Sequence, residues 1–192
     1  MIGAHLDGSH GKAWDGVHSA MTNEELKKTH RAVLQNAGDL VRAAKTLTAD
    51  LDHIRYHLAV LAIEEVGKAE LIGVRSVAAA AGRQADSLED AVDDHVKKLF
   101  WSLWGPSFGR QKITKEQLEL TQRVANRMHE TRLHYLYVDP ATPLLPEEKV
   151  DHQEVERIVE LADARVGLAK RSWHPGYRRA AERGSRMVPE DR

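Results

Sequence analysis

Two stretches of this sequence combine acids, bases and cations at spacings that could support chemistry. The first is Ile63-Glu-Glu-Val-Gly-Lys-Ala69, inside the longest apolar-rich run, roughly residues 51–81. At about 100° per residue, Glu65 projects into the edge of the apolar face of a helix. A carboxylate in that position is costly unless it is paired or hydrogen-bonded. We therefore expect Glu65 to meet a cationic or donor partner from another helix, unless it reaches past the apolar edge to water.

The second stretch carries Arg127 and His134, which are seven residues apart and share one face of a helix. Arginine is a good phosphate clamp, and histidine moves protons near neutral pH. Such a pair suffices for metal-independent RNA cleavage. The imidazole takes the proton of the ribose 2′-hydroxyl, that oxygen attacks the adjacent phosphate, and the cation stabilises the developing charge. The alternative is a solvated helix edge. The same face borders an apolar arc made of Leu120, Val124, Met128 and Tyr135.

Helical periodicity predicts the elements that must position these side chains. Thr22-Asn-Glu-Glu25 is a capping box that opens a first helix. No strand-like alternation appears in the chain. The expected helices cover about 23–48, a long central helix that stops near Gly82, and then about 88–104, 115–137 and 147–173. Five helices with mostly short links predict an all-α antiparallel bundle.

The length of 192 residues favours one domain. Residues 22–174 are expected to form that helical-bundle domain. Residues 1–21, rich in Gly and His, are expected to be a flexible N-terminal arm, and residues 175–192 a frayed, charged C-terminal tail.

Composition excludes several functional classes. The chain has no cysteine, so disulfides, thiolate zinc sites and cysteine nucleophiles are out. A net charge of −1 argues against a broad nucleic-acid-coating surface, and we expect no DNA partner. We also expect no membrane association, because no charge-free apolar run approaches the roughly 18 residues of a membrane span. No signal peptide is visible, so a cytoplasmic location is the default expectation.

A di-metal four-helix bundle is a competing interpretation, because helices bearing carboxylates and histidines invite it. That class needs two Glu-x-x-His-like pairs and carboxylates on two further helices. Asp50-x-x-His53 has this spacing, but Asp90, Asp93, Asp94 and Glu130 each lack a histidine three residues on. We therefore expect no metal and no cofactor.

Three segments occur in an order and at spacings that are typical of a known family. They are Ile63-Glu-Glu-Val-Gly-Lys-Ala69, Asp94-His95-Val-Lys97-Lys98 and Tyr137-Val-Asp139, the last after a basic helix. Together they resemble the AbiV family of bacterial abortive-infection proteins, which is related to the HEPN superfamily of helical bundles. The resemblance covers about residues 23–140, and the Glu-Glu-x-Gly-Lys segment followed by Asp-His-x-x-Lys is its most specific part.

The resemblance implies a HEPN-like bundle that dimerises and acts during phage infection as a toxin against the translation of its own host cell. Many HEPN proteins are endoribonucleases that use an arginine followed, after four to six residues, by a histidine. This chain offers Arg127 with His134, and also Arg123 with His129. Arg132 lies nearest to the family's own segment and joins the candidate cations.

We expect Glu65 to meet Arg127 or Arg132 across the contact between the second and fourth helices, which would hold an arginine near His134. The other motif residues receive binding or orienting roles. Glu64 and Lys68 are four residues apart and could be a surface pair, and Gly67 would let a neighbouring helix approach. Asp94 and His95 would orient Lys98 or line a groove in the bundle, or they would form a solvated helix face. Tyr137 and Asp139 follow the basic helix, and Asp139 could cap its end.

The principal alternative is a helical protein that works by binding alone. It would sense a phage protein, or inhibit translation by direct contact. Trp101 and Trp104, close to the break at Gly105-Pro106, could serve such a contact, although tryptophans at such a place also seal cores. The expected partners are therefore RNA, a second copy of the chain and a phage-encoded activator.

Overall fold

A computed structural model describes residues 22–80, 93–105, 114–138, 141 and 144–172. Five α-helices and two short 3-10 helices account for the regular structure of these residues, and none of them forms a strand. The all-α helical bundle predicted from periodicity is therefore confirmed. The expected N-terminal arm, residues 1–21, and C-terminal tail, residues 175–192, lie outside the described residues.

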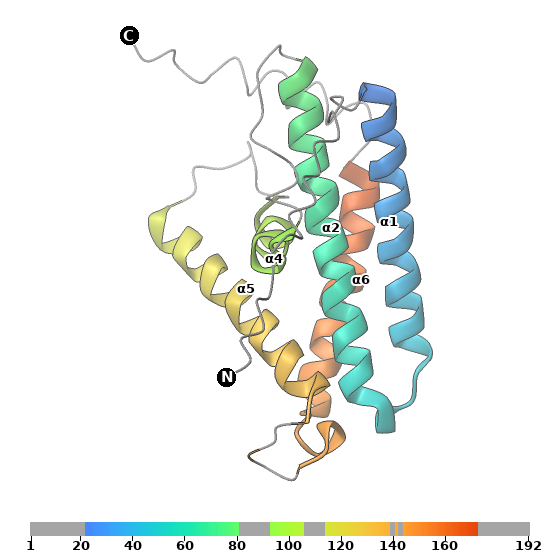
Figure 1. Ribbon diagram of the computed structural model, residues 1–192, viewed down its shortest axis with the longest axis vertical. Helices are drawn as coiled ribbons and strands as arrows, with labels where there is room; N and C mark the ends of the chain where they lie inside the picture. The colour runs from blue at the N-terminus through green and yellow to red at the C-terminus, as the bar shows by residue number, and fades with distance from the viewer. Residues whose placement is uncertain (1–21, 81–92, 106–113, 139–140, 142–143, 173–192) are drawn as a thin grey trace, which may run out of the picture.

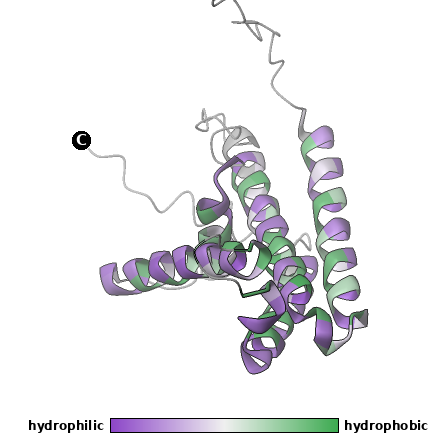
Figure 2. Ribbon diagram, turned by 60° about the horizontal axis from the view of Figure 1, so that its bottom comes forward, coloured by the Kyte–Doolittle hydropathy of each residue, from purple (hydrophilic) through white to green (hydrophobic). Residues whose placement is uncertain are grey.

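Three long helices form the main layer of the bundle. They are α1 (Asn23–Thr46), α2 (Asp52–Ala80) and α6 (His152–Ser172), and each packs against the other two. Figure 1 shows α2 running antiparallel to α1, with α6 beside both. In Figure 2 hydrophobic and hydrophilic residues recur along the helices, as amphipathic helices require. The core between them consists largely of small and β-branched side chains such as Ala37, Val41, Val60, Ala62 and Val159.

Two further helices, α4 (His95–Trp104) and α5 (Lys115–Leu136), contact α2 as well. Helix α2 therefore packs against every other α-helix of the described chain. Gly67 permits the closest of these approaches, since a Cβ atom at this position would lie 1.8 Å from the carbonyl oxygen of Lys98. Figure 1 shows α4 end-on beside α2, and α5 diverging from the bundle towards its N-terminal end.

Most helix boundaries follow local sequence signals. The capping box of Thr22 and Glu25 forms at the start of α1, and Thr114 and Gln117 form a second one at the start of α5. Helix α4 starts at His95 with Asp94 as its N-cap, and residues 88–92 of the expected third helix lie outside the described residues. The last helix begins later than expected, at His152 after a 3-10 turn, Pro146–Glu148.

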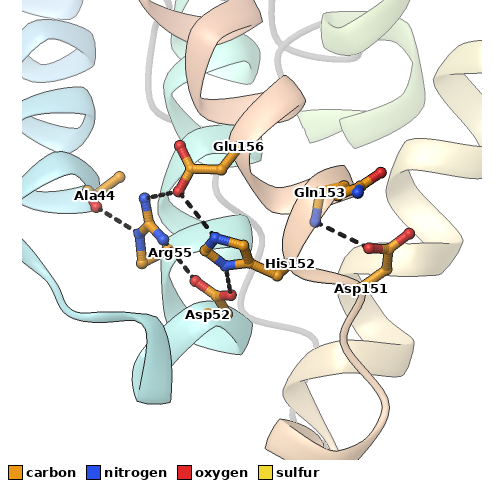
Figure 3. A network of polar contacts seen from close by, with 7 residues as sticks. All are labelled: Ala44, Asp52, Arg55, Asp151, His152, Gln153 and Glu156. Carbon is orange, nitrogen blue, oxygen red and sulfur yellow. Dashed lines mark hydrogen bonds and ion pairs between the residues drawn. The ribbon is translucent and has the colours of Figure 1, made fainter.

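A polar network ties α1, α2 and α6 together at the end where α2 and α6 begin (Figure 3). The buried Arg55 donates to the Ala44 carbonyl at 3.2 Å, to Asp52 at 2.6 Å and to Glu156 at 2.6 Å. The second carboxylate oxygen of Asp52 lies 2.6 Å from Nδ1 of His152. A buried guanidinium that donates to acceptors on three helices fixes the relative positions of those helices.

None of the described helices is long and apolar enough to cross a membrane.

Candidate functional site

The best-connected polar group of the motif segments is the carboxylate of Glu64. It lies in the middle of α2, where α4 and α5 both pack, and its residue is only 3% exposed. Burying a lone carboxylate is very costly, so its neighbours must supply charge and hydrogen bonds.

Three side chains from two other helices meet this requirement. Arg132 of α5, itself 4% exposed, donates through Nη1 to Oε1 of Glu64 at 2.6 Å. Nδ1 of His95 lies 2.7 Å from Oε2, and Nζ of Lys98 lies 3.6 Å from the same oxygen. The acid of α2 thus orders one side chain of α5 and two of α4 around itself.

A second imidazole extends this cluster towards the surface. The Nη2 group of Arg132 lies 3.2 Å from Nδ1 of His129, one turn earlier on α5. The rings of His129 and His95 then stack, with centroids 5.6 Å apart and an interplanar angle of 22°. The His95 side chain is 48% exposed and His129 is half-buried, so both rings reach the surface above the buried Glu64–Arg132 pair.

The charges of the cluster favour a neutral form of the imidazole on α5. Burial, followed by the positive charge of Arg132 and then by the neighbouring His95, lowers the pKa of His129 below its ordinary value. His57, on the same stripe of α2 as Glu64, has its pKa lowered for the same first two reasons. An imidazole that is neutral at physiological pH can take part in proton transfer and hydrogen bonding.

The expected ion pair exists, but we assigned it to the wrong acid. Glu65 does not reach Arg127 or Arg132; its carboxylate binds Lys68 at 2.7 Å, on the side of α2 that faces α1. We expected Glu64 to be a surface partner of Lys68, but it is buried against Arg132 instead. The two acids are adjacent in sequence, so their side chains point about 100° apart around the helix.

Arg127 and His134 do not join this cluster. Both are exposed on α5, and the ring contact of His134 is with its neighbour Tyr135, at 5.8 Å. The imidazoles that accompany the paired arginine are His129 and His95. Arg123 is exposed on the same helix, six residues before His129.

The remaining motif residues have separate positions. The Asp94 side chain accepts a hydrogen bond from the Lys97 amide at 3.0 Å, and so caps α4 at the turn that carries His95. Tyr137 is the exposed C-cap residue of α5. Asp139 lies outside the described residues. Trp101 and Trp104 pack against each other, with centroids 5.0 Å apart, and against Phe100.

The contact between His129 and Arg132 was not among our expectations. The two are three residues apart, which places them side by side on a helix, and this signal was available. The stacking of His129 on His95 could not be predicted from the sequence, because it depends on how α4 crosses α5. No group of three potential metal ligands comes together among the described residues.

The family model HEPN_AbiV, described as AbiV, matches residues 25–167 of this chain. No curated protein and no solved structure matches this chain. The matched span contains α2, α4, α5 and most of α1 and α6, and with them every residue of the Glu64 cluster.

Proposed function

This chain belongs to the AbiV family of HEPN proteins, and we propose that it is an abortive-infection toxin that cuts RNA without a metal ion. Cleavage of RNA would block host translation during phage infection, with a phage-encoded protein as the activator. The observation that carries the proposal is the pair of surface imidazoles, His95 and His129, above the buried Glu64–Arg132 ion pair.

Two stacked histidines supply what RNA transesterification needs from a protein. One imidazole removes the proton of the 2′-hydroxyl, and a second group stabilises charge on the phosphate. Arg132 is too deeply buried to contact a phosphate in this chain, so its role is to hold His129 and to compensate the charge of Glu64, which holds His95. Arg132 is therefore a structural cation and not the phosphate clamp that we expected from the sequence.

A homodimer is part of the proposal. Leu118, Leu120 and Val124 are exposed on the half of α5 that leaves the bundle. A second copy that covers these side chains would also bring a second set of imidazoles to the substrate.

The test is cleavage of single-stranded RNA in the presence of a chelator. His95→Ala and His129→Ala are each expected to lower the rate about 10²- to 10⁴-fold, the usual contribution of a proton-transferring side chain. The matched control is His152→Ala, since His152 is an exposed histidine that also contacts a buried acid, Asp52, but in the network of Figure 3. This variant should cut like the wild type.

Two results would contradict the proposal. If Arg127→Ala and His134→Ala abolish cleavage while the variants of His95 and His129 retain it, the nuclease centre is the exposed pair on α5. If the wild type cuts no RNA even when its phage trigger is present, the binding-only function replaces the enzyme. In that case the exposed apolar side chains of α5 would offer the surface for a protein partner.

A further inference from the structure

The two imidazoles of the cluster contact opposite kinds of hydrogen-bonding partner, and this decides which nitrogen of each ring carries a proton. A carboxylate can only accept a hydrogen bond, whereas a guanidinium can only donate. Nδ1 of His95 faces the carboxylate of Glu64, and Nδ1 of His129 faces the guanidinium of Arg132. The same ring atom must therefore be a donor in one histidine and an acceptor in the other.

We infer that His95 is the general base and His129 a neutral hydrogen-bond donor, and that Glu64 is the positioning residue that imposes both states. This inference rests on the proposed RNA cleavage. With its Nδ1 proton donated to Glu64, neutral His95 keeps a free lone pair on Nε2. With its Nδ1 occupied by Arg132, neutral His129 must carry its proton on Nε2.

The assignment defines one reaction. Nε2 of His95 takes the proton of a ribose 2′-hydroxyl, and the 2′-oxygen forms a bond to the adjacent phosphorus. The bond from phosphorus to the 5′-oxygen breaks, and that oxygen takes a proton from water, whose hydroxide then recovers the proton from Nε2 of His95. Nε2–H of His129 donates to a non-bridging phosphate oxygen while charge accumulates there. The products are a 2′,3′-cyclic phosphate and a 5′-hydroxyl. DNA is not cut, because it lacks the 2′-hydroxyl that attacks the phosphate.

Glu64 reaches both histidines without facing the substrate. It holds His95 directly, and it holds His129 through Arg132, whose two terminal nitrogens contact the carboxylate and the second ring. A glutamine in its place is neutral and can donate as well as accept. It would leave the Arg132 charge uncompensated and would allow His95 to adopt the other tautomer.

The first measurement is the nitrogen-15 NMR spectrum of the side chains of both histidines in the wild-type protein, at a pH where both rings are neutral. His95 is expected in the Nδ1–H form and His129 in the Nε2–H form. The opposite form in either ring would overturn the inference, whether or not the protein cuts RNA. The expected forms in a protein that cuts no RNA would leave the hydrogen-bond assignment standing, and the proposed function would fail.

The second measurement compares Glu64→Gln with the matched control Asp52→Asn. Asp52 is also a buried acid of α2 that holds an arginine and the Nδ1 atom of a histidine, but it lies twelve residues, about 18 Å, away along the helix. Glu64→Gln should lower kcat about 10²- to 10⁴-fold with little change in KM, as loss of a correctly held base does. It should also mix the two tautomers of His95.

Both substitutions should lower the melting temperature, but Asp52→Asn should leave kcat and the His95 spectrum as in the wild type. Equal losses of kcat in the two variants, with an unchanged His95 tautomer in both, would show that Glu64 matters only for stability. That result would overturn its positioning role.

Discussion

At the residue scale, adjacent acids in this chain have different environments. Glu64 is surrounded by Arg132, His95 and Lys98, whereas Glu65 pairs with Lys68 on the other side of α2. Glu70, less than two turns further along α2, lies in a third environment, in which burial of the carboxyl group is the dominant effect. Its side chain lies against Gly105 at the end of α4, where a Cβ atom would come within 2.8 Å of it. One helix thus carries three carboxylates with three electrostatic roles.

The environment of Glu70 predicts a pH-dependent stability. Burial raises the pKa of Glu70 from 4.5 to about 7, against the smaller opposing effect of Arg165. A carboxyl group whose pKa is higher in the folded state stabilises the fold below pH 4.5, and this stability is lost as the pH rises towards 7. The maximum loss corresponds to about 3 kcal/mol.

Glu70→Gln removes the charge and should therefore stabilise the protein at pH 8 more than at pH 5. Urea unfolding of the wild type and the variant at both pH values measures the difference. A gain that is the same at both pH values would mean that the Glu70 carboxylate is not penalised by burial.

At the element scale, the approach of α4 to α2 assembles the candidate site. Lys98 and His95 reach Glu64 only because α4 lies directly on Gly67. The expectation that Gly67 admits a neighbouring helix is confirmed by this contact. A helix that occupies the space left by the absent Cβ atom of a glycine is displaced by any larger residue at that position, since protein interiors are closely packed.

Gly67→Ala is accordingly expected to destabilise the fold by about 2 kcal/mol or more, in the upper range for overpacked cores, because the atom it meets is backbone. Gly167→Ala is the matched control within α6. A Cβ atom there would contact only Arg171, at 3.5 Å, which is an ordinary distance. That control should stabilise the protein by about 0.5–1 kcal/mol, because alanine has the higher helix propensity.

Denaturant unfolding of both glycine variants provides the measurement, and RNA cleavage at a temperature where both are folded provides a second one. Gly67→Ala should lose cleavage because it displaces His95 from Glu64. Stability and cleavage as in the wild type would contradict the close approach of the two helices.

At the scale of the whole molecule, the N-terminal half of α5 lacks a covering element among the described residues. Leu120 and Val124, four residues apart on one face, are 55% and 39% exposed. Such an apolar face on an extended helix is a surface suited to a partner. Our proposal assigns it to a second copy of the chain.

Light scattering should therefore find a dimer at micromolar concentration. Leu120→Lys should give a folded monomer, because a lysine ammonium at the centre of an apolar contact must lose its hydration. Leu145→Lys is the control, since Leu145 is a leucine of similar exposure, 49%, outside α5. A wild-type monomer, or a Leu120→Lys variant that stays dimeric, would exclude this interface.

Local patterns were sufficient for most of the helices and for the expectation that an acid of α2 meets an arginine of α5, but not for the identity of that acid. The capping boxes at Thr22 and Thr114, and the apolar periodicity between them, depend only on neighbours along the chain. The need of an acid in α2 for an arginine of α5 follows from the cost of burying charge, and Arg132 was one of the two candidates.

Contacts between helices were needed to choose the acid and the imidazoles. Glu64 rather than Glu65 is buried because α4 crosses α2 at Gly67, and one residue turns a side chain by about 100°. His95 and His129 are 34 positions apart in the sequence, and their rings meet only because α4 and α5 pack on the same side of α2. Periodicity gives the face on which each side chain lies, whereas the crossing of the helices selects which faces touch.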